Sequence, residues 1–234
     1  MELPIKESDK ILIIAPHADD ESIGCGGLMV LYGKKCDILL LTDGRKGYDS
    51  RLDTVDEDAL VHIRESELQS VSNLCGIRHI IKLRIPDGTI HSHMNDVLGV
   101  DITSYDFIFV PNRYERHKDH CIIPDLALKM KKQQRSKAQI IEYEVWSPMP
   151  NPVFALDISS VFSQKEHLVS QYQSQIKYKD YVRMTQGLNQ YRGVGFNMTY
   201  AEVYAPLVNK SFLLRLYNKL PSRVRKLLHK LLRS

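Results

Sequence analysis

The amino-acid sequence predicts an α/β fold built on a doubly wound, mostly parallel sheet flanked by helices. Short apolar runs of strand length recur along the chain, and Ile11-Leu12-Ile13-Ile14 is the first of them. Longer segments with helical periodicity separate these runs, and several runs end in polar loops that contain Asp, Gly or His. Strands that alternate with helices in this way indicate a parallel sheet covered by helices.

The first half of the chain contains three predicted strands with helices between them. The strands are residues 11–14, 36–41 and 80–83, and the helices are residues 24–35 and 56–74. Each strand is short and mainly apolar, as expected for buried strands of a parallel sheet. A turn at Pro86-Asp87-Gly88 follows the third strand.

The second half continues the pattern and ends in a strand. The predicted strands are residues 107–110, 140–145 and 201–204, and the predicted helices are residues 122–132 and 160–178. We find no internal repeat. The whole pattern is typical of a Rossmann-like fold.

The composition is that of a soluble globular protein, and we expect residues 1–209 to form a single domain. Of the 234 residues, 43% are hydrophobic and 26% charged, and no linker rich in Pro, Gly or Ser divides the chain. The four cysteines show no CxxC spacing, which argues against a zinc ribbon or a disulfide framework. The charged N-terminus lacks the apolar core of a signal peptide, and no apolar stretch has the ~20 residues that span a bilayer. We expect a cytoplasmic protein.

Residues 210–234 form a basic tail that differs from the rest of the chain. The tail contains eight Lys or Arg and no Asp or Glu, so residues 1–209 have a net charge of −4 although the whole chain has +4. The body therefore gives no reason to expect nucleic-acid binding. Apolar residues recur in the tail at helical spacing between Leu220 and Leu232. This pattern favours a basic amphipathic helix on an anionic membrane surface, and the alternative is a helix packed on the body or on a partner subunit.

Two clusters of His and Asp follow predicted strands and carry the functional signal. They are Pro16-His17-Ala18-Asp19-Asp20-Glu21 and His117-Lys118-Asp119-His120. Because ligands bind at the edge where parallel strands end, we expect the two clusters to enclose one ion. Zinc binds His nitrogen and Asp oxygen, and a catalytic zinc site commonly has three protein ligands and a water. One His and one Asp from the first cluster and one His from the second meet that count.

A metal site of this kind can hydrolyse an amide. The ion lowers the pKa of its bound water toward ~7, and a neighbouring carboxylate takes the proton as the water attacks a carbonyl. Adjacent carboxylates point in different directions, so one of Asp19 and Asp20 can bind the ion while the other faces the water. The spare imidazole of the second cluster suits the oxyanion and the departing amine. The spacing alone leaves open which Asp and which His takes each role.

The two clusters resemble those of the zinc-dependent N-acetylglucosaminyl deacetylases of the LmbE-like, PIG-L family. The resemblance covers about residues 10–205 and includes several further segments. These segments are Thr42-Asp43-Gly44, Arg64-Glu65, Pro86-Asp87-Gly88 and Tyr200-Ala201-Glu202. Many members of the family have Pro at the positions of Ala18 and Lys118, which lie between the functional side chains.

The resemblance implies a ligand set and a general base. It makes His17, Asp20 and His120 the ligands of a Zn²⁺ cofactor. Asp19 would then be the general base that works on the water.

The resemblance also implies roles around this centre. His117 would be the electrophilic or acid histidine, and Asp119 would be a carboxylate that orients its neighbouring imidazole. Arg64 and Asp87 resemble positions that contact the sugar. Glu21 receives no role.

Other motifs near the clusters favour structural explanations. Gly24-Cys25-Gly26-Gly27 lacks the GxGxxG spacing of a dinucleotide site and follows three carboxylates, so we expect a packing role. Cys25 is expected to be a small buried residue. His91 and His93 favour a solvated loop, with an accessory metal pair or a substrate contact as alternatives. Tyr114 precedes His117 by three residues and is not assigned to the family's active-site tyrosine.

The sequence therefore predicts a metal-dependent hydrolase that removes the acetyl group from an N-acetylhexosamine. The tail favours a glycoconjugate or a lipid-linked saccharide as the substrate. Two alternatives come from other classes of protein. One is a metal-dependent phosphoesterase, which needs two metals and more ligands. The other is a non-catalytic peripheral membrane protein whose sheet presents the basic tail.

Overall fold

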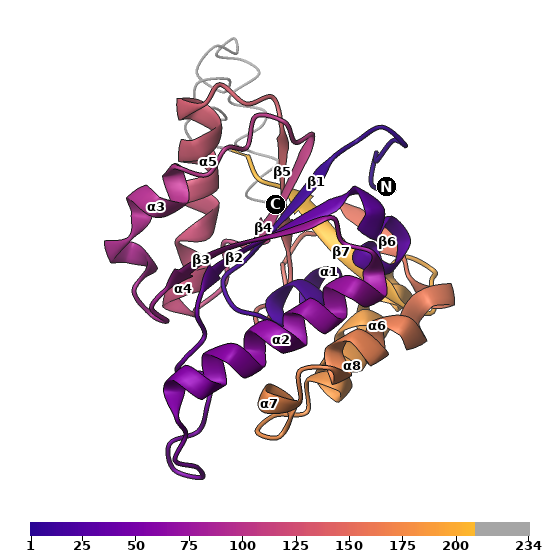
Figure 1. The fold of residues 1–234 in the computed structure, drawn as a ribbon. Helices are drawn as coiled ribbons and strands as arrows, with labels where there is room; N and C mark the ends of the chain where they lie inside the picture. The colour runs from indigo at the N-terminus through magenta and orange to yellow at the C-terminus, as the bar shows by residue number, and fades with distance from the viewer. Residues whose placement is uncertain (209–234) are drawn as a thin grey trace, which may run out of the picture.

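The computed structural model describes residues 1–208, which form one seven-stranded sheet between two layers of helices (Figure 1). The predicted basic tail, residues 210–234, lies outside the described residues. The strands are β1 (Ile11–Ala15), β2 (Cys36–Thr42), β3 (His79–Ile85), β4 (Phe107–Pro111), β5 (Gln139–Tyr143), β6 (Phe154–Asp157) and β7 (Ala201–Pro206). The α-helices are α1 (Asp20–Tyr32), α2 (Glu57–Cys75), α3 (Met94–Leu98), α4 (Lys118–Cys121), α5 (Ile123–Gln133), α6 (Phe162–Ser170), α7 (Gln173–Ile176) and α8 (Tyr181–Gly195).

The sheet is mostly parallel, as the sequence predicts. Its strand order is β3-β2-β1-β4-β5-β7-β6, and the first five of these strands run parallel. The last two differ, because β7 pairs antiparallel with both β5 and β6. The predicted strand 201–204 is β7, whereas β6 has no counterpart in the prediction. The order reverses beside β1, so the loops after β1 and β4 leave the sheet next to each other.

Alternate residues of each central strand face opposite layers of the core. In β1, Ile11 and Ile13 pack with α1 and α2, whereas Leu12 and Ile14 pack with α5. All four side chains are fully buried. In Figure 1, helices α1, α2, α6 and α8 cover one face of the sheet and α3 and α5 the other. Because both faces are covered, the strands are continuous apolar runs rather than alternating ones.

Helix α1 is kinked near its middle, and a buried carboxylate caps its second half. Cys25 has φ −130° and ψ 16°, outside the helical range. Beyond it, the backbone N–H groups of Gly27 and Leu28 donate to Glu202 at 2.6 and 2.9 Å. Lys165, which is fully buried, donates to the same carboxylate at 2.7 Å. This ion pair joins α1, α6 and β7.

The glycines of Gly24-Cys25-Gly26-Gly27 have the packing role that the sequence predicts. A Cβ on Gly24 would overlap the ring of Tyr143, and one on Gly27 would overlap the side chain of Ile158. Cys25 is fully buried, as expected.

Several helices differ from the sequence prediction, and α3, α4 and α8 have no counterpart in it. The single helix predicted over residues 160–178 is wrong, because the chain divides into α6 and α7 on either side of Tyr172. The hydroxyl of Tyr172 donates to the buried Glu21 in α1, which holds the chain in a turn at this point. Helix α1 begins at Asp20, four residues before the predicted start at residue 24.

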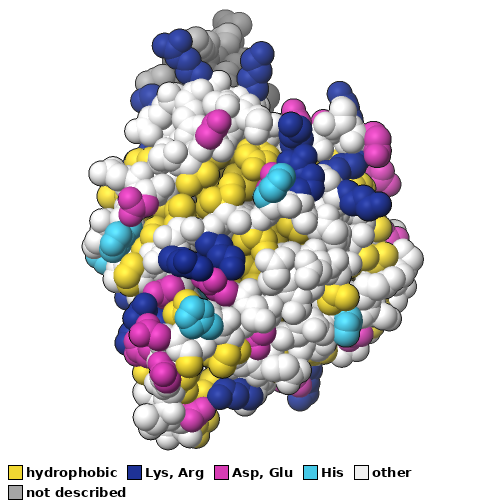
Figure 2. Space-filling model, viewed as in Figure 1, with side chains coloured by type: hydrophobic (Ala, Val, Ile, Leu, Met, Phe, Trp, Pro, Cys, Tyr) yellow, Lys and Arg dark blue, Asp and Glu magenta, His cyan; other side chains and the backbone are white. Residues whose placement is uncertain are grey.

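Strand β3 is an edge of the sheet and is only partly covered. Its apolar side chains Ile80, Ile81 and Leu83 are half-buried, and Figure 2 shows hydrophobic side chains across the middle of the face that carries this edge. Lys82 and Arg84 place charge along the strand, as is usual for an exposed edge. None of the helices within residues 1–208 combines the length and apolar character needed to cross a membrane.

Candidate active site

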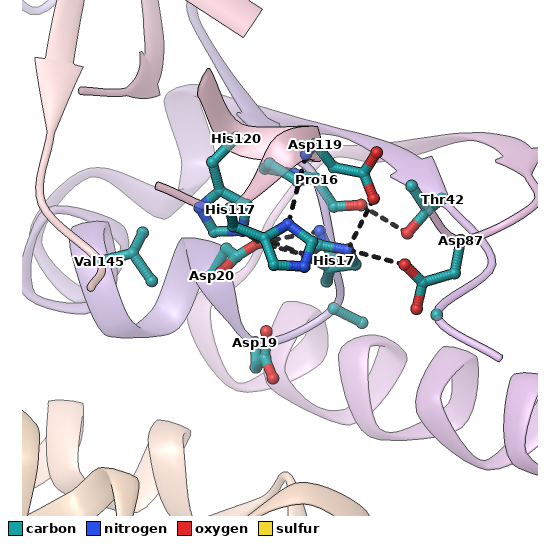
Figure 3. Close-up of polar contacts among 12 residues, drawn as sticks. Pro16, His17, Asp19, Asp20, Thr42, Asp87, His117, Asp119, His120 and Val145 are labelled. Atoms are coloured by element: carbon teal, nitrogen blue, oxygen red, sulfur yellow. Dashed lines mark hydrogen bonds and ion pairs between the residues drawn. The ribbon is translucent and has the colours of Figure 1, made fainter. Parts of the chain in front are cut away.

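The candidate site lies where the loops after β1, β3 and β4 meet (Figure 3). The first loop contains His17, Asp19 and Asp20, and it is fixed to the neighbouring strand at Pro16. The carbonyl oxygen of Pro16 accepts hydrogen bonds from the backbone N–H and the hydroxyl of Thr42, at 3.0 and 2.8 Å. The two His and Asp clusters of the sequence therefore lie together, as the rule for parallel strand ends predicts.

Three potential ligand atoms converge on one point in this site. His17 Nδ1, Asp20 Oδ2 and His120 Nε2 form a triangle in which each side is 3.2 Å. All three residues are buried. The backbone N–H of His17 also donates to Asp20 Oδ2, at 2.9 Å, which fixes the carboxylate. The two histidines are 103 residues apart in the sequence.

This triangle fits a tetrahedral metal ion. Zinc binds nitrogen and oxygen at about 2.0–2.1 Å, so two ligands of a tetrahedral site lie about 3.4 Å apart. Where neither of these ring nitrogens, 3.2 Å apart, carries a hydrogen, no hydrogen bond joins them, and a cation between them would satisfy both. His17, His117 and His120 also offer ring nitrogens that all lie within 4.8 Å of one another. The donor set is therefore suited to an ion such as Zn²⁺.

The second nitrogen of His17 faces two carboxylates. Nε2 lies 3.2 Å from Asp87 Oδ1 and 3.5 Å from Asp119 Oδ2. Asp119 thus lies against an imidazole from the other loop rather than one beside it in the sequence, and the backbone N–H of Gly88 holds it at 2.8 Å. Although burial opposes ionisation, the contact with His17 lowers the pKa of Asp87 to about 2. These contacts orient His17 so that Nδ1 faces the triangle.

His117 caps the short helix α4 at the rim of the site. Its Nδ1 accepts a hydrogen bond from the backbone N–H of Asp119 at 3.3 Å. In the neutral ring the hydrogen therefore lies on Nε2, which is free to donate. Desolvation and the neighbouring imidazole of His17 lower the pKa of His117, which favours this neutral form.

Asp19 has an unusual backbone conformation at the start of α1. Its φ of 142° and ψ of −31° lie outside the regions that L-residues normally occupy, at a cost on the order of 1–3 kcal/mol. The backbone N–H of Asp19 donates to Glu21 Oε2 at 3.1 Å, and Glu21 is fully buried. Glu21, which had no role in the sequence prediction, thus holds this conformation. In the sequence, Glu21 is distinguished only as the third of three consecutive carboxylates at the start of a buried helix.

A buried arginine holds the Asp19 side chain from behind. Arg64 Nη2 donates to Asp19 Oδ2 at 3.2 Å and to the carbonyl oxygen of Ala18 at 2.8 Å. Its Nη1 donates to the carbonyl of Gly44 at 3.1 Å. Burial raises the pKa of Asp19 to about 8, and the Arg64 charge opposes that rise. Within the described residues, Asp19 Oδ1 makes no hydrogen bond, and Asp19 lines the pocket above the site.

A pocket of about 1150 Å³ opens over this centre. His17, Asp19, Asp20, Arg64, Asp87, His117 and His120 line its inner part. Its outer wall combines aromatic and charged side chains, among them Tyr48, Asp49, Arg51, Tyr114, Arg116, Trp146, Tyr178, Lys179 and Tyr181. Seven of the eight predicted site residues line the pocket, and the eighth, Asp119, lies directly behind His17. His91 and His93 do not line the pocket that the described residues form.

The sequence matches the model of a known family across this site. The model is PIG-L, described as GlcNAc-PI de-N-acetylase, and the match covers residues 12–131, slightly more than half of the chain. This chain belongs to the PIG-L family. Both clusters of the candidate site lie inside the matched residues, and so do Arg64 and Asp87.

Three solved structures show how widely the fold of this PIG-L family member occurs. Conserved protein TT1542 from Thermus thermophilus is 24% identical, with a TM-score of 0.71 over 84% of this chain and 94% of that one. N,N'-diacetylchitobiose deacetylase from Pyrococcus horikoshii is 21% identical, with a TM-score of 0.75 over 87% and 85%. GalB, the 4-carboxy-2-hydroxymuconate hydratase from Pseudomonas putida, is 17% identical, with a TM-score of 0.70 over 86% and 97%. A deacetylase and a hydratase share this fold, so the reaction must be argued from the site.

Proposed function

We propose that this PIG-L family member is a metal-dependent hydrolase that removes the N-acetyl group from an N-acetylhexosamine of a glycoconjugate. The observation that carries the proposal is the 3.2 Å triangle of His17, Asp20 and His120 with the Asp19 carboxylate beside it. The description of the family as a GlcNAc-PI de-N-acetylase supports an acetamido sugar as the substrate. The diacetylchitobiose deacetylase among the structures of similar fold is consistent with it.

Zn²⁺ is the proposed ion, with His17 Nδ1, Asp20 Oδ2 and His120 Nε2 as its ligands. When bound, the ion would act as a Lewis acid and lower the pKa of a water toward ~7. Asp87 and Asp119 keep the ligating nitrogen of His17 aimed at it.

Asp19 is the proposed general base. Arg64 holds Oδ2, so Oδ1 is the atom that takes the proton as the water oxygen bonds to the acetamide carbon. The strained backbone of Asp19 fixes the direction of the carboxylate before substrate arrives.

His117 is the proposed electrophile. Its Nε2–H donates to the amide oxygen as negative charge develops there. When the C–N bond breaks, the departing nitrogen takes the proton that the water lost. The products are acetate and a free amino sugar.

The pocket favours a substrate larger than one sugar. Its volume of about 1150 Å³ slightly exceeds the roughly 300–1,000 Å³ that is common for small-molecule sites. Trp146 and Tyr181 offer aromatic surface, with ring centroids 5.2 Å apart. Arg116 and Lys179 form no ion pair within the described residues, which favours an aglycone with negative charge.

An Asp19 variant tests the mechanism directly. We expect Asp19→Asn to retain one Zn²⁺ per chain and to release acetate from an N-acetylglucosamine conjugate at least about 100-fold more slowly. Asp37→Asn, a buried carboxylate that Arg78 holds at 2.9 Å outside the pocket lining, is the matched control and should keep most of the activity. Unchanged turnover of Asp19→Asn would refute the assignment of the base.

A phosphoesterase is the second candidate, and one observation favours it. His17, Asp87 and Asp119 form a second group whose ligand atoms lie within 4.8 Å of one another. The two groups share the imidazole of His17, so a second ion requires His17 to bridge both. Two tightly bound metals per chain and release of phosphate from a sugar phosphate would support this candidate over the deacetylase.

The substrate and the tail can be tested together. We propose that residues 210–234 bring the enzyme to an anionic membrane surface that carries a lipid-linked sugar. Acetate release should be compared for free N-acetylglucosamine, a sugar nucleotide and a polyprenyl-linked sugar. The comparison uses the full chain and a variant with Arg223, Arg225 and Lys226 changed to Glu. An equal preference of both proteins for a small soluble sugar would remove the membrane proposal.

A further inference from the structure

Two buried polar atoms beside the proposed metal site face each other without a hydrogen bond. They are His120 Nδ1 and Glu115 Oε2, which lie 3.9 Å apart. Neither atom has a hydrogen-bond partner within the described residues. His120 is 0% exposed and Glu115 is 5% exposed, so bulk water does not supply partners. An unpaired buried polar atom costs about 1–3 kcal/mol, which indicates that a function retains the pair.

The other carboxylate oxygen of Glu115, Oε1, accepts several hydrogen bonds. Oε1 accepts the backbone N–H groups of Val145, Trp146 and Ser147 at 3.2, 2.9 and 3.0 Å. Asn112, from the same loop as Glu115, adds a fourth contact to Oε1 at 3.3 Å. These contacts hold the carboxylate in one orientation, with Oε2 directed toward His120.

Binding of an ion requires one particular form of His120. If Nε2 binds the ion, as the proposed function requires, the ring hydrogen must lie on Nδ1. A ligating histidine usually donates that hydrogen to a carboxylate or carbonyl. A charge-assisted hydrogen bond is about 2.7–2.9 Å long, so an approach of about 1 Å from 3.9 Å closes the contact.

We infer that Glu115 is the positioning residue of His120 and that its carboxylate couples the metal site to the pocket wall at Trp146. Oε2 accepts the Nδ1 hydrogen and leaves Nε2 free to bind the ion. Oε1 at the same time holds the Val145–Ser147 segment, from which Trp146 lines the pocket. Each ligating imidazole then has its own carboxylate partner: His17 has Asp87 and Asp119, and His120 has Glu115.

Glu115→Gln separates this role from simple packing. If the side-chain oxygen of the introduced glutamine stays with the three backbone N–H groups, its amide nitrogen faces His120 and donates to Nδ1. The ring hydrogen then moves to Nε2, where it blocks the ion. We expect Zn²⁺ affinity, measured by competition with a chromogenic chelator, to fall about 10–100-fold.

Glu142→Gln is the matched control for this experiment. Glu142 is equally buried and holds the same loop, because it accepts the backbone N–H of Arg113 at 2.8 Å and its guanidinium at 2.9 Å. Among the described residues, it makes no hydrogen bond or ion pair with His120. We expect Glu142→Gln to alter the unfolding free energy of the metal-free protein while its Zn²⁺ affinity stays within about threefold of wild type.

A second readout uses the wild-type protein and does not depend on folding of a variant. In ¹H–¹⁵N NMR spectra of the zinc-loaded protein, the resonance of the hydrogen on His120 Nδ1 should lie downfield. This hydrogen should exchange slowly with water. A His120 hydrogen that exchanges rapidly, or a Glu115→Gln variant that binds Zn²⁺ as tightly as wild type, would overturn the inference. Absence of Zn²⁺ binding by the wild-type protein would instead overturn the proposed function.

Discussion

Arg64 Nη2 lies 3.2 Å from Oδ2 of Asp19 and, through the carbonyl of Ala18, also holds the backbone on which Asp19 is carried. A single buried guanidinium therefore fixes both the side chain and the main chain of the proposed base. This geometry supports a role for Arg64 behind the base, in addition to the sugar contact that the family resemblance implies.

Replacement of Arg64 by lysine distinguishes these two roles. An ammonium group cannot match the planar fork of the guanidinium, so Asp19 loses its fixed direction. We expect Arg64→Lys to lower kcat for acetate release by about 100-fold or more, with little change in KM or zinc content. Arg192→Lys, at a buried arginine that pairs with Glu144 outside the pocket lining, is the control. A raised KM with unchanged kcat would show that Arg64 acts mainly by binding substrate.

Glu21 should matter for the rate as well as for stability. In Glu21→Gln, the amide cannot accept from both the Asp19 N–H and the Tyr172 hydroxyl in the wild-type arrangement. We expect the unfolding free energy to fall by about 1–3 kcal/mol and kcat to fall with it. Tyr172→Phe removes one donor and keeps the contact with Asp19, so it should lose stability but retain kcat. Equal loss of kcat in both variants would contradict this account.

The sequence predicts the centre of the fold well because apolar strands leave a strong signal. The runs at 11–14, 36–41 and 107–110 are all buried strands, and their parallel order brings His17 and His120 together. Strand β6 is too short and too close to prolines to give such a signal. Helix α8 contains many polar residues and three glycines and is only weakly amphipathic. Its apolar residues therefore do not recur at a clear helical spacing in the sequence.

The roles of individual carboxylates could not be predicted in the same way. Glu21 acts through Tyr172, which is 151 residues away in the sequence, and Glu115 acts through the segment after β5. Asp119 faces His17 and not a histidine of its own loop. Each of these contacts depends on how separate loops pack, and spacing within one loop carries no information about it.

Removal of one partner of the buried Lys165–Glu202 ion pair should strongly destabilise the fold. Lys165→Met leaves the Glu202 carboxylate buried without its countercharge, although Gly27, Leu28 and Tyr204 still donate to it. We expect the unfolding free energy, measured by chemical denaturation, to fall by about 3–5 kcal/mol. The double variant Lys165→Met/Glu202→Gln should recover part of this loss. Strict additivity of the two changes would argue that the charges do not interact.

The ion pairs between Glu65 of α2 and two residues of the edge strand β3, Lys82 and Arg84, predict that the unfolding free energy depends on pH. Glu65 is bonded to Arg84 at 2.8 Å and to Lys82 at 2.9 Å, and Arg84 is the main cause that lowers the pKa of Glu65 to about 2. Because the folded-state pKa lies below the ordinary value, this contribution is complete above about pH 4.5 and is lost as the pH falls toward 2. The difference in unfolding free energy between the metal-free wild type and Glu65→Gln should narrow steadily below about pH 4.5. A difference that stays constant across this range would contradict the assignment.

Titration of metal-free protein with Zn²⁺ tests the central claim, that His17, Asp20 and His120 hold one ion that is essential for deacetylation. Acetate release from an N-acetylglucosamine conjugate and bound zinc are measured on the same samples. The account predicts no turnover without metal, a rise in activity that ends at one equivalent per chain, and no such rise in His120→Ala. Undiminished acetate release by the metal-free protein would contradict it.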